Sequence, residues 1–275
     1  VERSRGLGDV YKRQYQKQIS VARLVVNAFG FSRGAAAARH FVNLAKKQPQ
    51  RFKFLGINKP GAVQVNFVGL YDTVSSFGGN FNNDEENLML NFSQFNSQAT
   101  KPKVFQIVAL DEYRENFSIT HIKSARNGKF GIEVGINGAH SDIGGGYHVQ
   151  ESEEYDTEVN QQVLRNWLIG KGFYKKFEER YTYVGKDSRK QLSHYHAART
   201  VYQGIHKISL KIMRVTLEHA IVDIKFNKTL EFEEAVTGKV KTEMGHFAAK
   251  VNQLCQKGWG VHPNIIPLSI KSASN

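Results

Sequence analysis

A short turn with two glycines constrains the fold more than any other feature of this sequence. It reads Gly30-Phe-Ser-Arg-Gly34, with a run of apolar, β-prone residues before it and an alanine-rich run of high helix propensity directly after it. The pattern predicts a strand, a sharp turn and a helix, as in a nucleophile elbow. Glycines two positions either side of the serine would let the strand and the helix approach closely.

Ser32 has two interpretations from the sequence. Its hydroxyl could be exposed at the carboxyl end of the strand and act as a nucleophile. Alternatively, Ser32 could simply be the N-cap of the helix, a position that favours serine. The flanking strand and helix favour the nucleophile, and the backbone amide of Arg33 would then be one donor of an oxyanion hole.

Asp72 and His140 also follow predicted strands. Residues 63–71 predict a buried strand that ends at Asp72, and residues 129–136 predict another that leads into His140 and three glycines, Gly144–Gly146. Ser32, Asp72 and His140 therefore occur in the chain order of an α/β-hydrolase triad, at the edge where α/β sheets bind ligands. A loop-capping Asp72 remains an alternative, and the glycines lack the Lys-Ser/Thr of a P-loop.

The remaining segments complete a prediction of an α/β fold, in which helices flank a mostly parallel central sheet that is incomplete in this chain. Helical spacing predicts helices over residues 35–46, 104–117, 159–170, 205–220 and 244–256. In the first helix, the residues expected to be buried are Ala38, Phe41, Val42 and Ala45. Glu112 and Arg114 could anchor loops near the site, although a solvated helix end fits their charged segment better.

The chain is expected to have three parts. Residues 15–148 would form an α/β-hydrolase core, residues 149–204 an insertion or lid, and residues 205–275 C-terminal helices that complete the domain. The insertion begins with an acidic run and becomes rich in lysine and tyrosine. Residues 258–267 predict a terminal loop.

The first 14 residues differ from the rest. Residues 4–14 resemble the translation of a transposon-end sequencing adapter, so we leave residues 1–14 out of the fold prediction. They hold four basic and two acidic side chains, so the net charge of +13 falls to +11 without them. We expect the native protein to extend upstream of Tyr15, where the first strands and the second oxyanion donor would lie.

Charge and composition narrow the classes of partner. With 38 basic and 25 acidic residues, the protein favours anionic partners such as phospholipid headgroups. The basic residues are scattered and no nucleic-acid module is visible, so no nucleic-acid partner is expected. Cys255 is the single cysteine, and His194, His196 and His206 lack a cysteine or carboxylate at ligand spacing. We therefore expect neither a metal nor a cofactor.

Three segments, in this order, resemble the signatures of a known family. They are Gly30-Phe-Ser-Arg-Gly-Ala35 with Ala38-Arg39, Gly69-Leu-Tyr-Asp-Thr-Val74 and Gly138-Ala-His-Ser-Asp-Ile-Gly-Gly-Gly-Tyr147. The segment Ile208-Ser-Leu-Lys-Ile-Met213 is similar to a fourth, weaker block. Over about residues 20–225 the chain resembles the type VI secretion lipase effectors, which belong to a broader group of bacterial and fungal α/β hydrolases. It departs from them in lacking their Asp-Gly-Thr-type loop and in the long segment 150–204.

The resemblance implies phospholipase activity, with Ser32 as nucleophile, Asp72 as acid and His140 as base. It also implies an antibacterial effector that is made in the cytoplasm and delivered by a secretion spike protein, and that is matched by a cognate immunity protein. Such an effector would act in the periplasm or at the membrane surface of the target cell. Two alternatives stay open from the sequence: a carboxylesterase on non-lipid esters, and a non-catalytic interaction module that keeps the fold.

Overall fold

The computed structural model describes residues 23–55, 57, 61–75, 84–87, 89–145, 150–184, 190–202, 205–221, 224, 238–262 and 264–268. The adapter-like segment 1–14 lies outside the described residues. The chain divides into two compact units. Unit 1 comprises the chain up to Gly145 and from Gly204 onward, and unit 2 comprises Gly146–Gln203.

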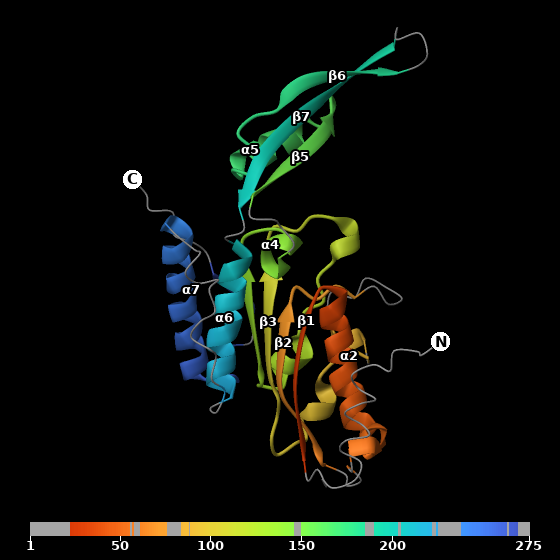
Figure 1. Cartoon of the computed structure of the whole chain (residues 1–275), viewed down its shortest axis with the longest axis vertical. Helices are drawn as coiled ribbons and strands as arrows, with labels where there is room; N and C mark the ends of the chain where they lie inside the picture. The colour runs from red at the N-terminus through yellow and green to blue at the C-terminus, as the bar shows by residue number, and fades with distance from the viewer. Residues whose placement is uncertain are drawn as a thin grey trace, which may run out of the picture. The chain divides into compact units, whose positions relative to one another are not determined.

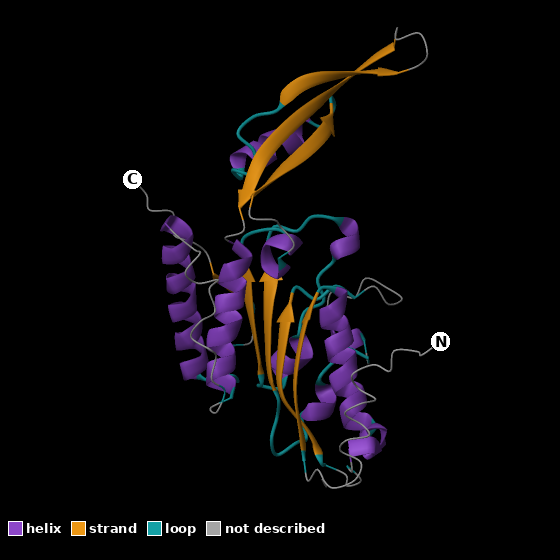
Figure 2. Cartoon of the chain, viewed as in Figure 1, coloured by secondary structure: helices purple, strands orange, loops and turns teal. Residues whose placement is uncertain are grey.

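A five-stranded parallel sheet forms the centre of unit 1 (Figures 1 and 2). Its strands, in spatial order, are β1 (Leu24–Phe31), β2 (Val63–Tyr71), β3 (Lys103–Ala109), β4 (Gly131–Ile136) and β8 (Ile266–Leu268). Phe31 pairs with Tyr71, Tyr71 with Ile107, and Ala109 with Ile136, so the first four strands end at one edge. The predicted α/β class with a parallel sheet is confirmed.

Helices cover both faces of this sheet, and each face has its own apolar core. The helices of unit 1 are α2 (Arg33–Lys47), α3 (Lys123–Asn127), α4 (His140–Gly144), α6 (Ile205–Ala220) and α7 (Gly238–Lys257). One core joins α2 and α3 to β1 and β2, and the other joins α6 and α7 to β3, β4 and β8. Short 3₁₀ turns in the connections are η1 (Pro49–Leu55), η2 (Asp84–Glu86), η3 (Ser93–Phe95) and η4 (Glu115–Phe117).

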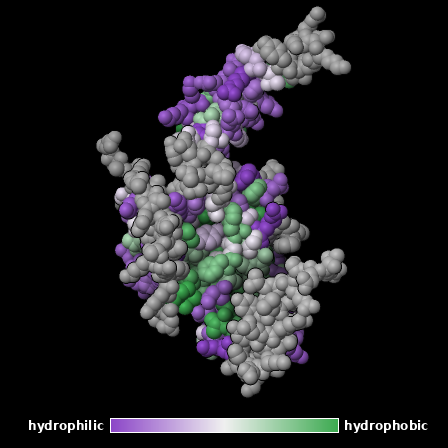
Figure 3. Space-filling view, in the orientation of Figure 1, coloured by the Kyte–Doolittle hydropathy of each residue, from purple (hydrophilic) through white to green (hydrophobic). Residues whose placement is uncertain are grey.

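Strand β1 lies at the edge of the described sheet. Val26 and Ala28 pack under α2, whereas Val25 and Phe29, on the opposite side of the strand, are 42% and 46% exposed. Figure 3 shows hydrophobic residues over the middle of unit 1, where strands run between α6 and α2. None of the described helices has the length and hydrophobicity needed to cross a membrane.

Unit 2 is a three-stranded antiparallel sheet with one helix. Its strands β5 (Gln150–Glu158), β6 (Glu178–Val184) and β7 (Lys190–Tyr202) lie in the order β5-β7-β6, and its helix is α5 (Gln162–Gly170). The buried Arg165 of α5 lies 3.8 Å from the ring centroid of Tyr195, and its guanidinium donates to the carbonyl oxygens of Glu158 and Val159 at 2.6 and 3.1 Å. These contacts hold the helix on the strands. The role of lid remains a prediction.

The structure corrects the helix predicted over residues 104–117. This segment forms β3, a loop and η4. Val104, Phe105, Ile107 and Val108 are all buried, because β3 is a central strand covered on both faces. A continuous apolar run of this kind also fits helical spacing, so periodicity alone misassigned it.

Two further predictions need adjustment. Phe41 is 45% exposed and packs edge-on against Phe52, whereas Ala38, Val42 and Ala45 are buried as expected. The predicted terminal loop contains the start of β8. The acidic run 151–158, for which no element was predicted, is part of strand β5. The predicted helices over 35–46, 205–220 and 244–256 are confirmed as α2, α6 and part of α7, and α5 accounts for most of the predicted segment 159–170.

Candidate active site

Ser32 occupies the turn between β1 and α2 with a strained backbone. Its φ of 58° and ψ of −126° lie in a region that residues other than glycine rarely adopt. Its N–H donates to the Tyr71 carbonyl at 3.0 Å, and its carbonyl accepts from the N–H groups of Ala35 at 3.0 Å and Val74 at 3.3 Å. The strand, the helix and the Asp72 loop therefore together hold the conformation typical of a nucleophile elbow.

The Ser32 hydroxyl does not cap the helix. Ser32 occupies the N-cap position, but its side chain makes no capping hydrogen bond. Arg33 is the first helical residue, and the N–H at that position has no acceptor within a helix. The Arg33 amide thus directly follows Ser32 at the positive end of α2, as an oxyanion donor requires.

The two glycines of the elbow differ in their steric role. A Cβ atom on Gly30 would lie 2.3 Å from the Gly34 carbonyl oxygen and 2.6 Å from the Ala35 Cα, so only glycine fits. A Cβ atom on Gly34 would meet nothing within 4 Å. The predicted close approach therefore depends on Gly30, and the prediction was wrong for Gly34.

Asp72 follows β2 and is almost completely buried, with 1% of its surface exposed. Its Oδ2 lies 2.6 Å from His140 Nδ1, and its Oδ1 accepts the Ala109 N–H at 2.9 Å. Both carboxylate oxygens thus bond to residues that are distant in sequence rather than to their own loop. Its φ of 43° makes Asp72, like Ser32, one of three described non-glycine residues with a positive φ.

His140 begins α4, and only 4% of its surface is exposed. Its ring lies between Phe31 and Phe117, with centroid distances of 4.5 and 4.9 Å. Because Phe31 directly precedes Ser32, the imidazole lies beside the elbow. Within the described residues no hydrogen bond joins the Ser32 hydroxyl to His140; such bonds in ligand-free enzymes often tighten only when substrate binds.

The structure contradicts the interpretation of Glu112 as part of a solvated helix end. Its side chain is only 8% exposed, and its Oε2 accepts the His140 backbone N–H at 3.1 Å. Burial opposes ionisation, but the hydrogen bonds from Arg114 and His140 outweigh it and lower the pKa of Glu112. Assigning residues 103–109 as a strand would have placed Glu112 at the same sheet edge as Ser32.

A buried polar network behind Asp72 was also missed from sequence. Thr73 Oγ1 donates to Gln106 Oε1, and Gln106 Nε2 donates to Glu133 Oε1 at 2.7 Å and to the Thr120 carbonyl at 3.1 Å. Arg39 of α2 is fully buried and donates to the same carbonyl at 2.9 Å. This network could have been predicted from two polar residues inside strand-forming runs, Gln106 and Glu133.

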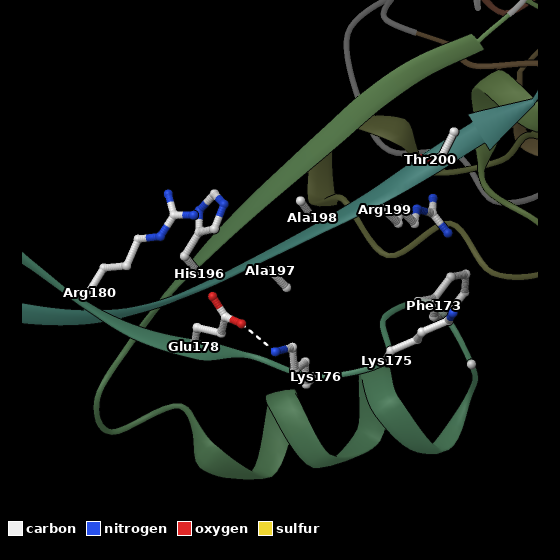
Figure 4. Close-up of a pocket in the computed structure, with 11 residues that line it drawn as sticks. Phe173, Lys175, Lys176, Glu178, Arg180, His196, Ala197, Ala198, Arg199 and Thr200 are labelled. Atoms are coloured by element: carbon white, nitrogen blue, oxygen red, sulfur yellow. Dashed lines mark ion pairs between the residues drawn. The ribbon is translucent and has the colours of Figure 1, made fainter.

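Two cavities differ in their chemistry. One of about 390 Å³ adjoins Asp72 and is also lined by Glu112, Tyr113, Arg114 and Phe117. The other, of about 680 Å³, lies in unit 2 (Figure 4). Its cationic lining residues are Lys175, Lys176, Arg180 and Arg199, and Glu178 forms an ion pair with Lys176. Although larger, the second cavity contains none of the predicted site residues.

The three histidines considered for a metal site belong to two different units of the chain. His194 and His196 belong to β7 of unit 2, and His206 belongs to α6 of unit 1. His196 Nδ1 lies 2.7 Å from Asp156 Oδ1. Across the described ranges, no three His, Cys, Asp or Glu side chains are arranged to hold a metal ion.

Comparison with known proteins gives a match to one family model. The family model for the type VI secretion phospholipase effector Tle1-like catalytic domain matches residues 45–171, a range that includes Asp72 and His140 and begins after Ser32. No curated protein sequence matches the chain.

A solved structure of the Tle1 effector bound to the VgrG spike of the type VI secretion system is similar in fold. The TM-score is 0.62 with 23% sequence identity, over 89% of this chain and 56% of that chain. This chain therefore spans little more than half the length of the effector structure. The resemblance predicted from the sequence motifs is confirmed: this chain is similar to the Tle1-like phospholipase effector catalytic domain over residues 45–171 and to the solved Tle1 effector in fold.

Proposed function

We propose that this protein is a serine ester hydrolase that cleaves acyl esters of glycerophospholipids. The observation that carries the proposal is the strained Ser32 elbow beside a buried pair of Asp72 and His140, 2.6 Å apart, at one sheet edge. Ser32 is the nucleophile, His140 the general base and Asp72 the group that orients the imidazole.

The reaction would proceed in two halves. Ser32 Oγ attacks the ester carbonyl carbon while its proton passes to His140 Nε2, and Asp72 stabilises the imidazolium through Nδ1–H. The Arg33 amide donates to the oxyanion. The intermediate collapses to an acyl-serine, and the leaving alcohol takes the proton from His140. Water then releases the fatty acid by the same steps in reverse.

Two observations favour a phospholipid over another ester. The chain is similar to the Tle1-like phospholipase effector catalytic domain over residues 45–171, and its net charge of +13 favours an anionic membrane surface. From the same similarity we propose an antibacterial effector that is carried by a spike protein into a target cell and neutralised there by an immunity protein. The solved relative is bound to such a spike.

Two measurements test this proposal. The first is fatty-acid release from phosphatidylglycerol vesicles, and the second is covalent labelling by a fluorophosphonate, which reports an activated serine without a lipid surface. Ser32→Ala should abolish both, whereas Ser97→Ala, at an exposed loop serine, should change neither. Unchanged release in Ser32→Ala, or a wild-type protein inactive in both assays, would overturn the proposal.

A carboxylesterase acting on non-lipid esters is the alternative. A short-chain ester assayed below and above its critical micelle concentration separates the two. A phospholipase should become faster once the substrate forms an interface, whereas a carboxylesterase should simply saturate.

A further inference from the structure

We infer that Glu112, supported by Arg114 and Phe117, positions His140 for proton transfer. The inference rests on the proposed function, because it assigns to these residues a role that acts through the proposed general base. Glu112 is a positioning residue rather than a catalytic one, since its carboxylate reaches the backbone of His140 and not the reacting atoms.

The first contact fixes the backbone of His140. His140 is the first residue of α4, and an N–H at that position has no acceptor within its own helix. Glu112 Oε2 accepts this N–H at 3.1 Å. A hydrogen bond to an ionised carboxylate is stronger than a neutral one, so Glu112 holds the point from which the imidazole projects.

Glu112 is itself held rigidly. Its Oε1 accepts from the Arg114 N–H at 2.8 Å and from Arg114 Nε at 2.9 Å, while its Oε2 accepts from Arg114 Nη2 at 2.8 Å. Paired bonds between a guanidinium and a carboxylate fix orientation as well as distance. The carboxylate is therefore in place before substrate arrives.

The same arginine extends the restraint to the imidazole ring. The Arg114 guanidinium carbon lies 3.6 Å from the centroid of the Phe117 ring, and Phe117 packs edge-on against the His140 ring at 4.9 Å. Phe31 contacts the ring as well, and Asp72 bonds to Nδ1. Nε2 is then the ring nitrogen with no hydrogen-bond partner in the described part of the chain, as a general base for Ser32 requires.

Asp111 shows what a purely structural carboxylate does in the same loop. Its Oδ2 accepts from the Gly138 N–H and from Asn137 Nδ2, each at 3.0 Å, which ties down the connection between β4 and α4. Within the described part of the chain, no hydrogen bond joins Asp111 to His140 itself. Asp111 is therefore a matched control, one residue away from Glu112, for a general effect on the loop.

The experiment compares Glu112→Ala, Glu112→Gln and Asp111→Ala in hydrolysis of a soluble monomeric ester. Glu112→Ala should lower kcat about 100-fold with little change in KM, because a small displacement of a catalytic group affects the transition state more than substrate binding. Glu112→Gln should recover most of kcat, since its amide oxygen can still accept the His140 N–H. Asp111→Ala should lose no more than about threefold.

A spectroscopic signal separates positioning from mere stability. The proton shared by His140 Nδ1 and Asp72 should give a low-field ¹H NMR resonance that disappears in Asp72→Asn. That resonance should broaden or vanish in Glu112→Ala and persist in Asp111→Ala. If Glu112→Ala does not fold, Arg114→Lys tests the same point, because lysine cannot hold the carboxylate in the same paired geometry.

Equal kcat values in Glu112→Ala and Asp111→Ala, or an unchanged resonance in Glu112→Ala, would overturn the inference. Failure of the proposed function looks different. A wild-type protein that neither hydrolyses esters nor reacts with a fluorophosphonate refutes the hydrolase, while the resonance still tests whether Glu112 orders His140.

Discussion

The sheet edge of unit 1 and the cavity of unit 2 both gather charged side chains, but they hold them in opposite ways. At the sheet edge Asp72, His140 and Glu112 are nearly buried, and each bonds to a specific partner. In the cavity of unit 2, Lys175 and Arg180 are exposed and form no ion pair with any described residue. Fixed buried groups suit chemistry, whereas exposed cations act at longer range and are screened by salt.

The largest expected effect tests the buried groups at the sheet edge of unit 1. Asp72→Asn should lower the rate of fluorophosphonate labelling at Ser32 by about 10⁴-fold, because an amide cannot stabilise the imidazolium or select its tautomer. Asparagine tolerates a positive φ and can still accept the Ala109 N–H, so the fold should survive. An unchanged circular dichroism spectrum is the control, and near-normal labelling would contradict the assignment of Asp72.

The elbow glycines offer a second test, now of stability. Gly30→Ala should destabilise unit 1 by about 1–3 kcal/mol, because its Cβ atom would overlap Gly34 and Ala35. Gly34→Ala should instead stabilise unit 1 by up to about 1 kcal/mol, because its Cβ atom meets open space in the first turn of a helix.

The two tryptophans make this measurement specific to one unit. Trp259 packs edge-on against Phe67 and Phe105 in unit 1, and Trp167 lies in α5 of unit 2. In a Trp167→Phe background, the remaining tryptophan is Trp259. Urea unfolding monitored by tryptophan fluorescence therefore reports on unit 1 alone. Equal stabilities for the two glycine variants would contradict the steric difference between Gly30 and Gly34.

A third test concerns the exposed cations in the cavity of unit 2. Lys175→Ala/Arg180→Ala should weaken binding to phosphatidylglycerol vesicles roughly 10- to 30-fold, since each cation near an anionic surface contributes about 1 kcal/mol. Fluorophosphonate labelling of Ser32 should not change. Lys46→Ala/Lys47→Ala removes the same charge from the end of α2 and is the matched control. An equal loss in both double variants would mean that net charge, and not this cavity, attracts the membrane.

The sequence predicted the elements whose chemistry is local. The elbow could be read from Gly30 and Ser32, because a strand, a turn and a helix follow one another there. The strands before Asp72 and His140 could be predicted for the same reason, and the chain order of the three residues indicated a shared edge. Whether the three side chains act together as a catalytic triad remains a prediction.

What the sequence missed depends on partners that are distant along the chain. Glu112 looked like part of a solvated helix end because the buried strand before it was assigned as a helix. Strand β5 carries an acidic sequence with no apolar alternation, and its cross-strand partners become visible only in the fold. Arg199 bonds to Glu153 at 2.5 Å and His196 to Asp156 at 2.7 Å.

The smallest expected effect concerns pH and again contrasts a buried carboxylate with an exposed one. The pKa of Glu112 is lowered in the folded state from its ordinary 4.5, so its ionised form stabilises the fold above that pH. This contribution is lost as pH falls through the lower folded pKa. Glutamine cannot ionise, so the difference in Tm between wild type and Glu112→Gln should be largest near pH 7 and narrow below about pH 4.5.

Glu85 is the control for this last measurement. A hydrogen bond from Lys123 lowers its pKa as well, but its side chain is 38% exposed, so solvent weakens the pair. Glu85→Gln should therefore show a smaller change in Tm with pH than Glu112→Gln, in the same direction. A Tm difference for Glu112→Gln that stays constant across this pH range would mean that the pKa of Glu112 is the same in the folded and the unfolded protein, so that its contacts do not favour the ionised form. The proposed charge-assisted bond to the His140 N–H would then be wrong.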